Sequence, residues 1–202
     1  PALLAKTAAT LDSISKGRLE LGVGMGWQEE EYHAAGVPFE KRSEIFWETL
    51  KICQLLWKSS PASYEGNIYK FDDIWCQPQP FQGADLPLLF GLKMTKITAQ
   101  KIADIGHGWI PIKTDAEFIS NGKELLTEAF KGNNNQSAPR IRGQLPTQID
   151  ASGAPNLELT LQQAEKSIAA GLTEIEIFPI NFVRSKDDIK PVLSAISDLS
   201  KL

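Results

Sequence analysis

Leu21-Gly22-Val23-Gly24-Met25-Gly26-Trp27 is the stretch on which the fold assignment depends. Together with residues 18–20 before it, this stretch predicts a short strand that ends in glycines, and glycine lets the backbone turn where a side chain would clash. Residues 2–16 carry apolar side chains at helical spacing, and Gly17 follows as a typical helix-closing residue. A helix therefore leads into a strand that ends in a glycine-rich turn.

The alternation of strand and helix continues along the chain. The apolar run Pro87 to Gly91 is typical of a strand that is buried on both faces of a parallel sheet. Further strands are predicted at 108–111, 140–145 and 174–178, and helices at 41–57, 95–105, 115–131, 158–170 and 186–199. Five strands, each followed by a helix, predict an α/β fold with a parallel sheet.

One excursion interrupts this alternation at about residues 60–82. Aromatic and β-branched residues flank Glu65-Gly66-Asn67, a pattern that predicts a hairpin with a tight turn, and a proline-rich exit follows at 77–80. With 202 residues the chain can bury one substantial core. We therefore expect a single domain over residues 1–202 that includes this hairpin.

The beginning of the chain bears on the choice between an open sheet and a closed barrel. Five strands would complete a doubly wound sheet, whereas a (β/α)8 barrel would lack three units. The chain opens on Pro1, without an initiator methionine, directly at a helix that no strand precedes. This favours a fragment that has lost strands from its front.

Composition argues against several classes of partner. The chain has 21 basic and 25 acidic residues, so it lacks the basic footprint of a nucleic-acid-binding protein. No apolar run approaches the roughly 18 residues that would suggest a membrane span. Two cysteines and two histidines without neighbouring ligands predict neither a disulfide framework nor a metal site. We expect a cytoplasmic protein without nucleic-acid, membrane or metal partners.

The glycine-rich turn has a steric and a ligand-binding interpretation. Its spacing differs from the dinucleotide fingerprint G-x-G-x-x-G, and a polar stretch follows it before any helix. Trp27 favours the ligand-binding interpretation, because an aromatic side chain beside three glycines at the end of a strand can wall a pocket for a flat ring.

Several motifs in consistent order resemble the bacterial luciferase-like family. They lie at residues 1–6, 8–12, 15–18, 21–27, 36–42, 77–82, 87–91 and 106–109. The resemblance implies a (β/α)8 TIM barrel, of which this chain would be about the last five β/α units. It also implies an oxidoreductase or monooxygenase that acts on a small organic substrate with F420 or FMN, F420 being slightly favoured. The alternative is a non-catalytic flavin-binding protein or an incomplete structural relative.

By position, the resemblance implies cofactor contacts in two turns. They are Gly24, Met25, Gly26, Trp27 and Gln28 in the first turn, and Gly91, Leu92, Lys93 and Thr95 in the second. Met25 cannot donate a proton, so we expect it to form a flexible apolar wall. Gln28 can hydrogen-bond a ring edge or stay solvated. The helix start near Thr95 favours a phosphate, with a threonine cap and solvated lysines as the alternative.

No catalytic residue is assigned, and contacts to a small-molecule substrate rest on topology alone. Lys113 and Asn181 follow predicted strands and face the ligand-binding end of a barrel. A homodimer is compatible with the open sheet edges that a five-strand piece would leave.

Overall fold

The computed structural model describes residues 1–133 and 137–199. The chain forms two compact units, Pro1–Gly91 and Leu92–Leu202. Both contain parallel strands and helices, so the predicted α/β class is confirmed. The polar turn expected around residues 132–137 falls partly on 134–136, which lie outside the described residues.

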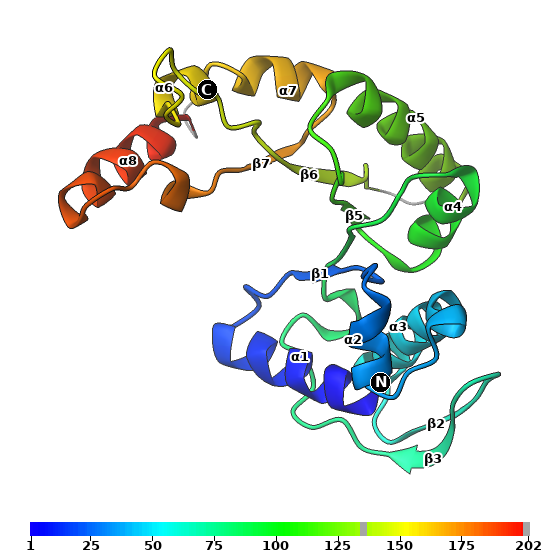
Figure 1. Ribbon diagram of the computed structural model, residues 1–202. Coiled ribbons are helices and arrows are strands. Elements are labelled where there is room, and N and C mark those ends of the chain that lie inside the picture. Colours follow the sequence, from blue (N-terminus) through cyan, green and yellow to red (C-terminus); the bar gives the residue numbers. More distant parts are fainter. Residues whose placement is uncertain (134–136, 200–202) are drawn as a thin grey trace. The chain divides into compact units, whose positions relative to one another are not determined.

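The first unit is built around two parallel strands, β1 and β4, with helices packed against them (Figure 1). Leu21 pairs with Leu88 and Val23 with Phe90. In chain order its elements are α1 (Ala2–Ser15), β1 (Leu21–Val23), α2 (Glu29–Ala34), η1 (Phe39–Lys41), α3 (Arg42–Lys58), β2 (Ala62–Glu65), β3 (Lys70–Ile74), η2 (Gly83–Asp85) and β4 (Leu88–Phe90). The helices predicted at 2–16 and 41–57 are therefore confirmed.

Aromatic side chains organise the core of this unit. Phe90 is fully buried and stacks on Trp47 of α3, with ring centroids 5.4 Å apart. Trp57, near the end of α3, donates its indole N–H to the carbonyl of Ala5 at 3.0 Å. Because both groups are buried, this bond fixes α1 against α3 without leaving an unsatisfied polar atom.

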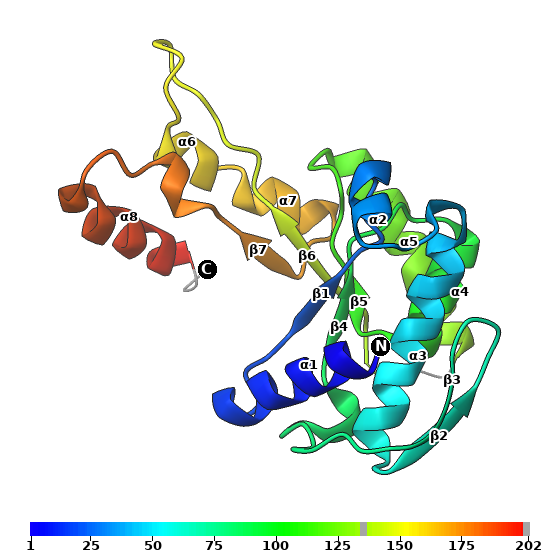
Figure 2. The ribbon, with the colours of Figure 1, turned by 60° about the horizontal axis from the view of Figure 1, so that its bottom comes forward.

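The predicted hairpin is also confirmed. Strands β2 and β3 pair antiparallel and run near α3 (Figure 2). The carboxylate of Glu48, a buried residue of α3, accepts hydrogen bonds from the backbone N–H groups of Asn67, Ile68 and Tyr69, the shortest at 2.8 Å. A single side chain thus anchors the hairpin turn to the helix.

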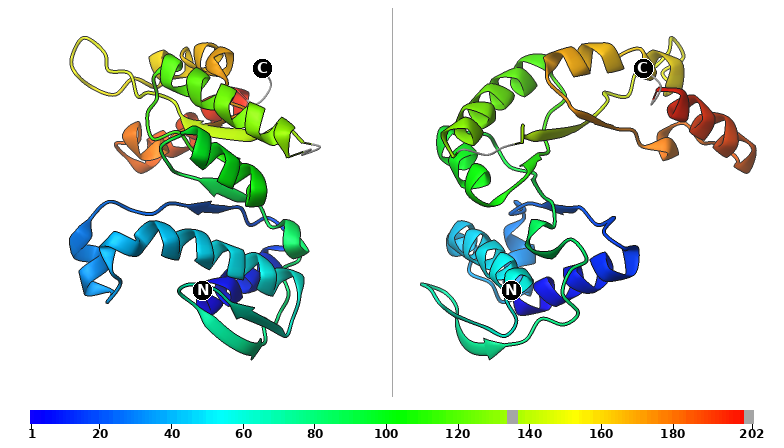
Figure 3. Two further views of the ribbon diagram at one scale, coloured as in Figure 1. Left: turned by 90° about the vertical axis from the view of Figure 1, so that its right-hand side faces the viewer. Right: turned by 180° about the vertical axis from the view of Figure 1, so that it is seen from behind.

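The second unit has three parallel strands in the order β5, β6, β7. Helices α5 and α7 lie on one side of β6 and β7, as Figure 1 and the rear view in Figure 3 show. In chain order its elements are α4 (Lys96–Ile105), β5 (Gly108–Trp109), α5 (Ala116–Gly132), β6 (Arg140–Gln144), α6 (Leu157–Leu161), α7 (Ala164–Ala170), β7 (Glu174–Glu176), η3 (Pro179–Asn181) and α8 (Lys186–Leu199).

Trp109 is the centre of the second core. It is fully buried and donates its indole N–H to the carbonyl of Leu92 at 2.8 Å. Helix α5 approaches this ring at Gly122, where a Cβ atom would lie only 2.2 Å from the indole. Glycine at position 122 therefore sets how closely α5 packs on β5.

The structure corrects the helix predicted at 158–170, which is broken into α6 and α7. The N–H of Gln163 donates to the carbonyl of Thr160, three residues back, as in a turn. Thr160 is buried and accepts the N–H of Gln148 on its hydroxyl. This long-range contact anchors Thr160 beside the break, and helical periodicity does not reveal it.

Each of the five predicted strands is shorter in the structure; β1, for example, covers only Leu21–Val23 of the strand predicted over residues 18–24. The strand expected at 108–111 ends at Trp109, and Pro111, which has no N–H, cannot extend a ladder. The strand expected at 174–178 ends at Glu176, because Phe178 precedes a 3-10 turn that begins at Pro179.

Candidate functional site

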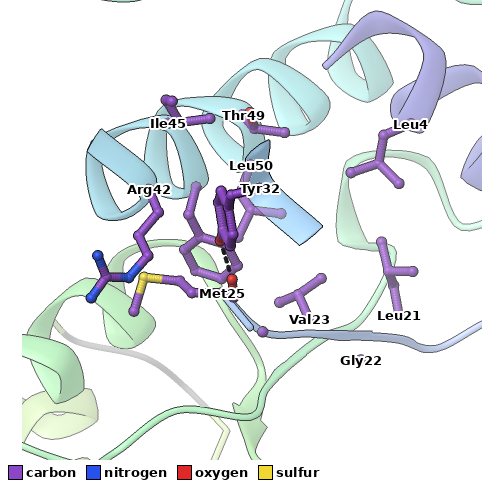
Figure 4. A pocket seen from close by; sticks show the side chains of 12 residues that line it. Leu4, Leu21, Gly22, Val23, Met25, Tyr32, Arg42, Ile45, Thr49 and Leu50 are labelled. Atoms are coloured by element: carbon purple, nitrogen blue, oxygen red, sulfur yellow. Dashed lines mark hydrogen bonds between the residues drawn. The ribbon is translucent and has the colours of Figure 1, made fainter. Parts of the chain in front are cut away.

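The glycine-rich turn gives β1 two different faces. Leu21 and Val23 point from the strand toward the helix layer, as the close view in Figure 4 shows. Gly22 and Gly24 alternate with them and are exposed. One face of the strand end is therefore bare backbone, which a flat molecule can approach closely.

Gly24 and Gly91 lie side by side at the carboxyl ends of the paired strands. The N–H of Gly91 donates to the carbonyl of Val23 at 2.8 Å. A Cβ atom on Gly24 would lie 3.3 Å from the carbonyl oxygen of Gly91, which is tighter than most such contacts. The structure thus brings together two glycines, 67 positions apart in the sequence, that were predicted to contact a cofactor.

The helix side of β1 holds a cavity of about 350 Å³. Met25 and Arg42 lie next to each other at one end of it (Figure 4). The hydroxyl of Tyr32 donates to the carbonyl of Met25, and Arg42 donates to the carbonyl of Phe39 at 2.8 Å. The apolar lining comes from Leu4, Leu21, Val23, Ile45, Phe46 and Leu50. No pattern in the sequence assigns Tyr32 a binding role, and Arg42 stands out there only as the end of the motif at residues 36–42.

Gly26, Trp27 and Gln28 do not line this cavity. Gly26 has φ +72°, a conformation that favours glycine, and Trp27 is 82% exposed. Gln28 is exposed and precedes α2 without capping it through its side chain. The indole of Trp27 and the amide of Gln28 are therefore accessible from solvent at the carboxyl end of β1.

The second predicted turn continues from Gly91 into the second unit. The hydroxyl of Thr95 accepts the N–H of Thr98 at 3.1 Å, which is the threonine cap considered as the alternative to a phosphate contact. Lys93 is exposed, whereas Leu92 is buried and its carbonyl accepts the Trp109 bond. The phosphate contact stays a prediction.

Side chains at the carboxyl ends of the later strands are partly engaged. The amide of Asn181 donates to the hydroxyl of Thr147 at 3.2 Å, so it ties η3 to the segment after β6. The ammonium of Lys113 lies 5.7 Å from the centre of the Phe118 ring. Substrate contacts by Lys113 and Asn181 stay predictions.

A charged ladder on β6 and β7 was not anticipated as a site. Arg140 and Arg142 both donate to Glu174, and Nε of Arg142 lies 3.9 Å from the carboxylate of Glu176. The hydrogen bond from Arg140, reinforced by that from Arg142, holds the pKa of Glu174 below its ordinary value against the opposing effect of burial. The period-two pattern of charges in Arg140–Gln144 and Glu174–Glu176 was the available signal.

Other chemistries find little support in the part of the chain that the structure describes. Burial raises the pKa of the Cys53 thiol to about 12, so it is not a thiolate nucleophile at neutral pH. Within residues 1–133 and 137–199, no group of three or more metal-ligating side chains is close enough to hold an ion. In the same residues no helix combines the length and the apolar character needed to cross a membrane.

Comparison with known proteins gives these features a context. The model of the family described as luciferase-like monooxygenase matches residues 1–152. An uncharacterised protein of Mycobacterium tuberculosis is 35% identical over 141 residues, which are 70% of this chain and 49% of that protein. The chain thus spans about half the length of these curated relatives.

Solved structures of low sequence identity share the fold. An F420-dependent secondary alcohol dehydrogenase in complex with an F420-acetone adduct has a TM-score of 0.74 at 17% identity, covering 88% of this chain and 68% of that one. The F420-dependent tetrahydromethanopterin reductase from Methanopyrus kandleri has a TM-score of 0.74 at 16% identity, covering 96% and 77%. The FMN complex of the oxygenating constituent of 3,6-diketocamphane monooxygenase from Pseudomonas putida has a TM-score of 0.59 at 17% identity, covering 74% and 45%. The expected fold, α/β and TIM-barrel-like, is confirmed.

Proposed function

The chain belongs to the luciferase-like monooxygenase family, and from this premise we propose that it forms part of an oxidoreductase that binds F420 or FMN at the carboxyl end of β1. A small organic molecule is the proposed substrate. This end of the strands is also where barrel enzymes hold their ligands.

The observation that carries the proposal is the bare backbone face at Gly22 and Gly24. A flat tricyclic ring needs a surface without side chains on one side, and both glycines are exposed and alternate with Leu21 and Val23, whose side chains point toward the helices. The backbone of both glycines also borders the cavity on the helix side of β1. Gly91 adds a second bare position beside Gly24. The residues present therefore fit a flavin-type ring.

The neighbouring side chains fit roles in binding such a ring. Met25 supplies an adaptable apolar contact, and the exposed indole of Trp27 supplies an aromatic surface. Gln28 can hydrogen-bond a carbonyl or N–H at the ring edge. When bound, the cofactor supplies hydride transfer or oxygen activation, while the protein positions the ring and the substrate and excludes water.

We favour F420 over FMN as the cofactor. Two of the structural neighbours described above are F420-dependent enzymes and one is an FMN complex. The start of α4 suits the phosphate that either cofactor carries, and Lys93 beside it supplies an exposed positive charge. A non-catalytic relative that binds the cofactor alone is the second candidate, because Met25 places no titratable group in the turn.

Titration of the chain with F420 and, separately, with FMN tests the proposal. We expect saturable binding of F420, followed by its fluorescence, and weaker binding of FMN. Binding of neither cofactor would refute the proposed function. Cofactor binding without turnover of any reduced or oxidised substrate tested would favour the non-catalytic candidate.

A further inference from the structure

The face of β6 and β7 that points away from the helices is polar. Ile141 and Leu145 are each 1% exposed, and the side chain of Leu172 lies against Gly143 on the helix side. Because side chains alternate along a strand, the intervening residues share the opposite face. They are Arg140, Arg142 and Gln144 on β6, and Glu174 and Glu176 on β7. A parallel sheet buried between apolar layers would not carry this set.

Most of the charge on this face is neutralised internally. Glu174 receives hydrogen bonds from both Arg140 and Arg142, the Nε bond of Arg142 measuring 2.6 Å. The side chains of Arg142 and Glu174 are 22% and 26% exposed. This inner part of the ladder is therefore a satisfied network, and the geometry gives it a structural role.

The outer end of the same face keeps open hydrogen-bonding capacity. Gln144 and Glu176 are direct partners in the β6–β7 register and lie at the carboxyl ends of their strands. The carboxylate of Glu176 is 41% exposed, and among the described residues its one ion-pair contact is with Arg142 at 3.9 Å. Within the described residues, no hydrogen bond to another side chain or to the backbone engages the side-chain amide of Gln144.

The chemistry of Gln144 and Glu176 limits the class of ligand that the pair can bind. An anionic group would meet the Glu176 carboxylate, and a cationic group would meet the guanidinium of Arg142, whose Nε lies 3.9 Å from that carboxylate. A purely apolar group would strip water from both side chains without replacing its hydrogen bonds. A neutral group with an N–H next to a carbonyl satisfies both, because the carboxylate accepts and the amide donates.

We propose that Gln144 and Glu176 form a binding pair, within the second unit, for the –NH–CO– edge of a neutral amide or lactam. The carbonyl of the ligand accepts from the Gln144 amide, and its N–H donates to the Glu176 carboxylate. This inference goes beyond the proposed function, since it assigns a ligand-binding role to residues of the second unit alone.

The test uses three small probes and the full chain without cofactor. Ligand-observed NMR titrations compare 2-piperidone, which has the N–H and the carbonyl, with N-methyl-2-piperidone and cyclohexanone, which lack the N–H. We expect 2-piperidone to bind at least about tenfold more tightly than either analogue, because each analogue leaves the carboxylate unpaired. Equal binding of the three probes by the wild-type chain would overturn the proposal, whatever the variants do.

Substitutions locate the site. Gln144→Leu and Glu176→Leu should each weaken 2-piperidone binding by about tenfold. Two exposed residues, Gln162 in the turn between α6 and α7 and Glu165 in α7, provide the matched controls Gln162→Leu and Glu165→Leu, which should bind like wild type. Wild-type affinity in both site variants would contradict the proposal.

Cofactor titration of the same variants separates this inference from the proposed function. We expect Gln144→Leu and Glu176→Leu to keep the wild-type affinity for F420. If they lose F420 binding as well, the assignment of this pair to an amide ligand is wrong. If the wild-type chain binds 2-piperidone selectively but neither F420 nor FMN, the proposed function fails while the amide-binding pair stands.

Discussion

Gly122 shows how a single hydrogen atom in place of a side chain determines helix packing. Trp109 fills the space where a Cβ atom at position 122 would lie, at 2.2 Å from the ring. Trp109 is itself fully buried and hydrogen-bonded, so the ring has little room to move aside.

We predict that Gly122→Ala lowers the free energy of unfolding by about 1–3 kcal/mol, the usual range for an overpacked core. Gly132→Ala is a matched control, because position 132 ends the same helix and a Cβ atom there would contact nothing within 4 Å. Urea unfolding of both variants measures the difference. Equal midpoints for Gly122→Ala and wild type would show that α5 can shift away from Trp109.

Glu174 makes the free energy of unfolding depend on pH under acidic conditions. Hydrogen bonds from Arg140 and Arg142 hold its pKa below the unfolded value, so the folded state favours the carboxylate. Its stabilisation is present above the unfolded pKa of about 4.3 and is lost as the pH falls through the lower folded pKa.

We therefore predict that Glu174→Gln flattens the decline in stability between about pH 5 and the acid limit of folding, while lowering stability at neutral pH. Urea unfolding at a series of pH values measures both effects. Glu165→Gln, at an exposed helix position, is the control and should reproduce the wild-type profile. A Glu174→Gln profile parallel to that of wild type would be inconsistent with the depressed pKa.

At the scale of elements, the hairpin β2–β3 depends on one buried carboxylate. Glu48 accepts three backbone N–H groups from the turn, and they would lose this partner in its absence. Asn67 is exposed and Ile68 and Tyr69 are half-buried, so water can replace part of the lost bonding, and each hydrogen bond contributes about 0.5–1.5 kcal/mol net.

We predict that Glu48→Ala lowers the free energy of unfolding by about 1–3 kcal/mol. The same substitution should speed hydrogen exchange at the amides of Asn67, Ile68 and Tyr69. Glu48→Gln, which keeps an acceptor oxygen, should have a smaller effect. The control Lys51→Ala alters an exposed residue of the same helix. Unchanged exchange at the three amides in Glu48→Ala would rule out this anchoring role.

Local patterns in the sequence predicted elements better than contacts between them. Apolar periodicity located α1 and α3 to within about one residue, because one face of each helix packs on the strands. The break between α6 and α7 was missed, because it involves the contact of Thr160 with Gln148. Likewise, no local pattern pairs Glu48 with a turn about twenty residues later.

At the scale of the whole molecule, each unit has a helix-covered face and a face that the helices leave free. In the first unit the free face carries Gly22 and Gly24, and in the second it carries the ladder from Arg140 to Glu176. The glycine turn was predictable because glycines at a strand end have a direct conformational meaning. The ladder was not predicted, because the pairing of its charged side chains depends on which strands become neighbours.

The affinity of the chain for F420 in the presence and absence of a side chain at position 24 tests the central claim most directly. Gly24→Val places a branched side chain where even a Cβ atom would lie 3.3 Å from the Gly91 carbonyl, on the face proposed for the ring. Gly132→Val is the control, because a Cβ atom at position 132 would meet no atom within 4 Å among the described residues outside its own helix turn. Circular dichroism and thermal unfolding verify that both variants fold.

We predict that Gly24→Val weakens F420 binding by at least about tenfold, equivalent to about 1.4 kcal/mol, while Gly132→Val binds like wild type. A folded Gly24→Val variant with wild-type affinity for F420 would contradict the claim that the bare end of β1 holds the cofactor.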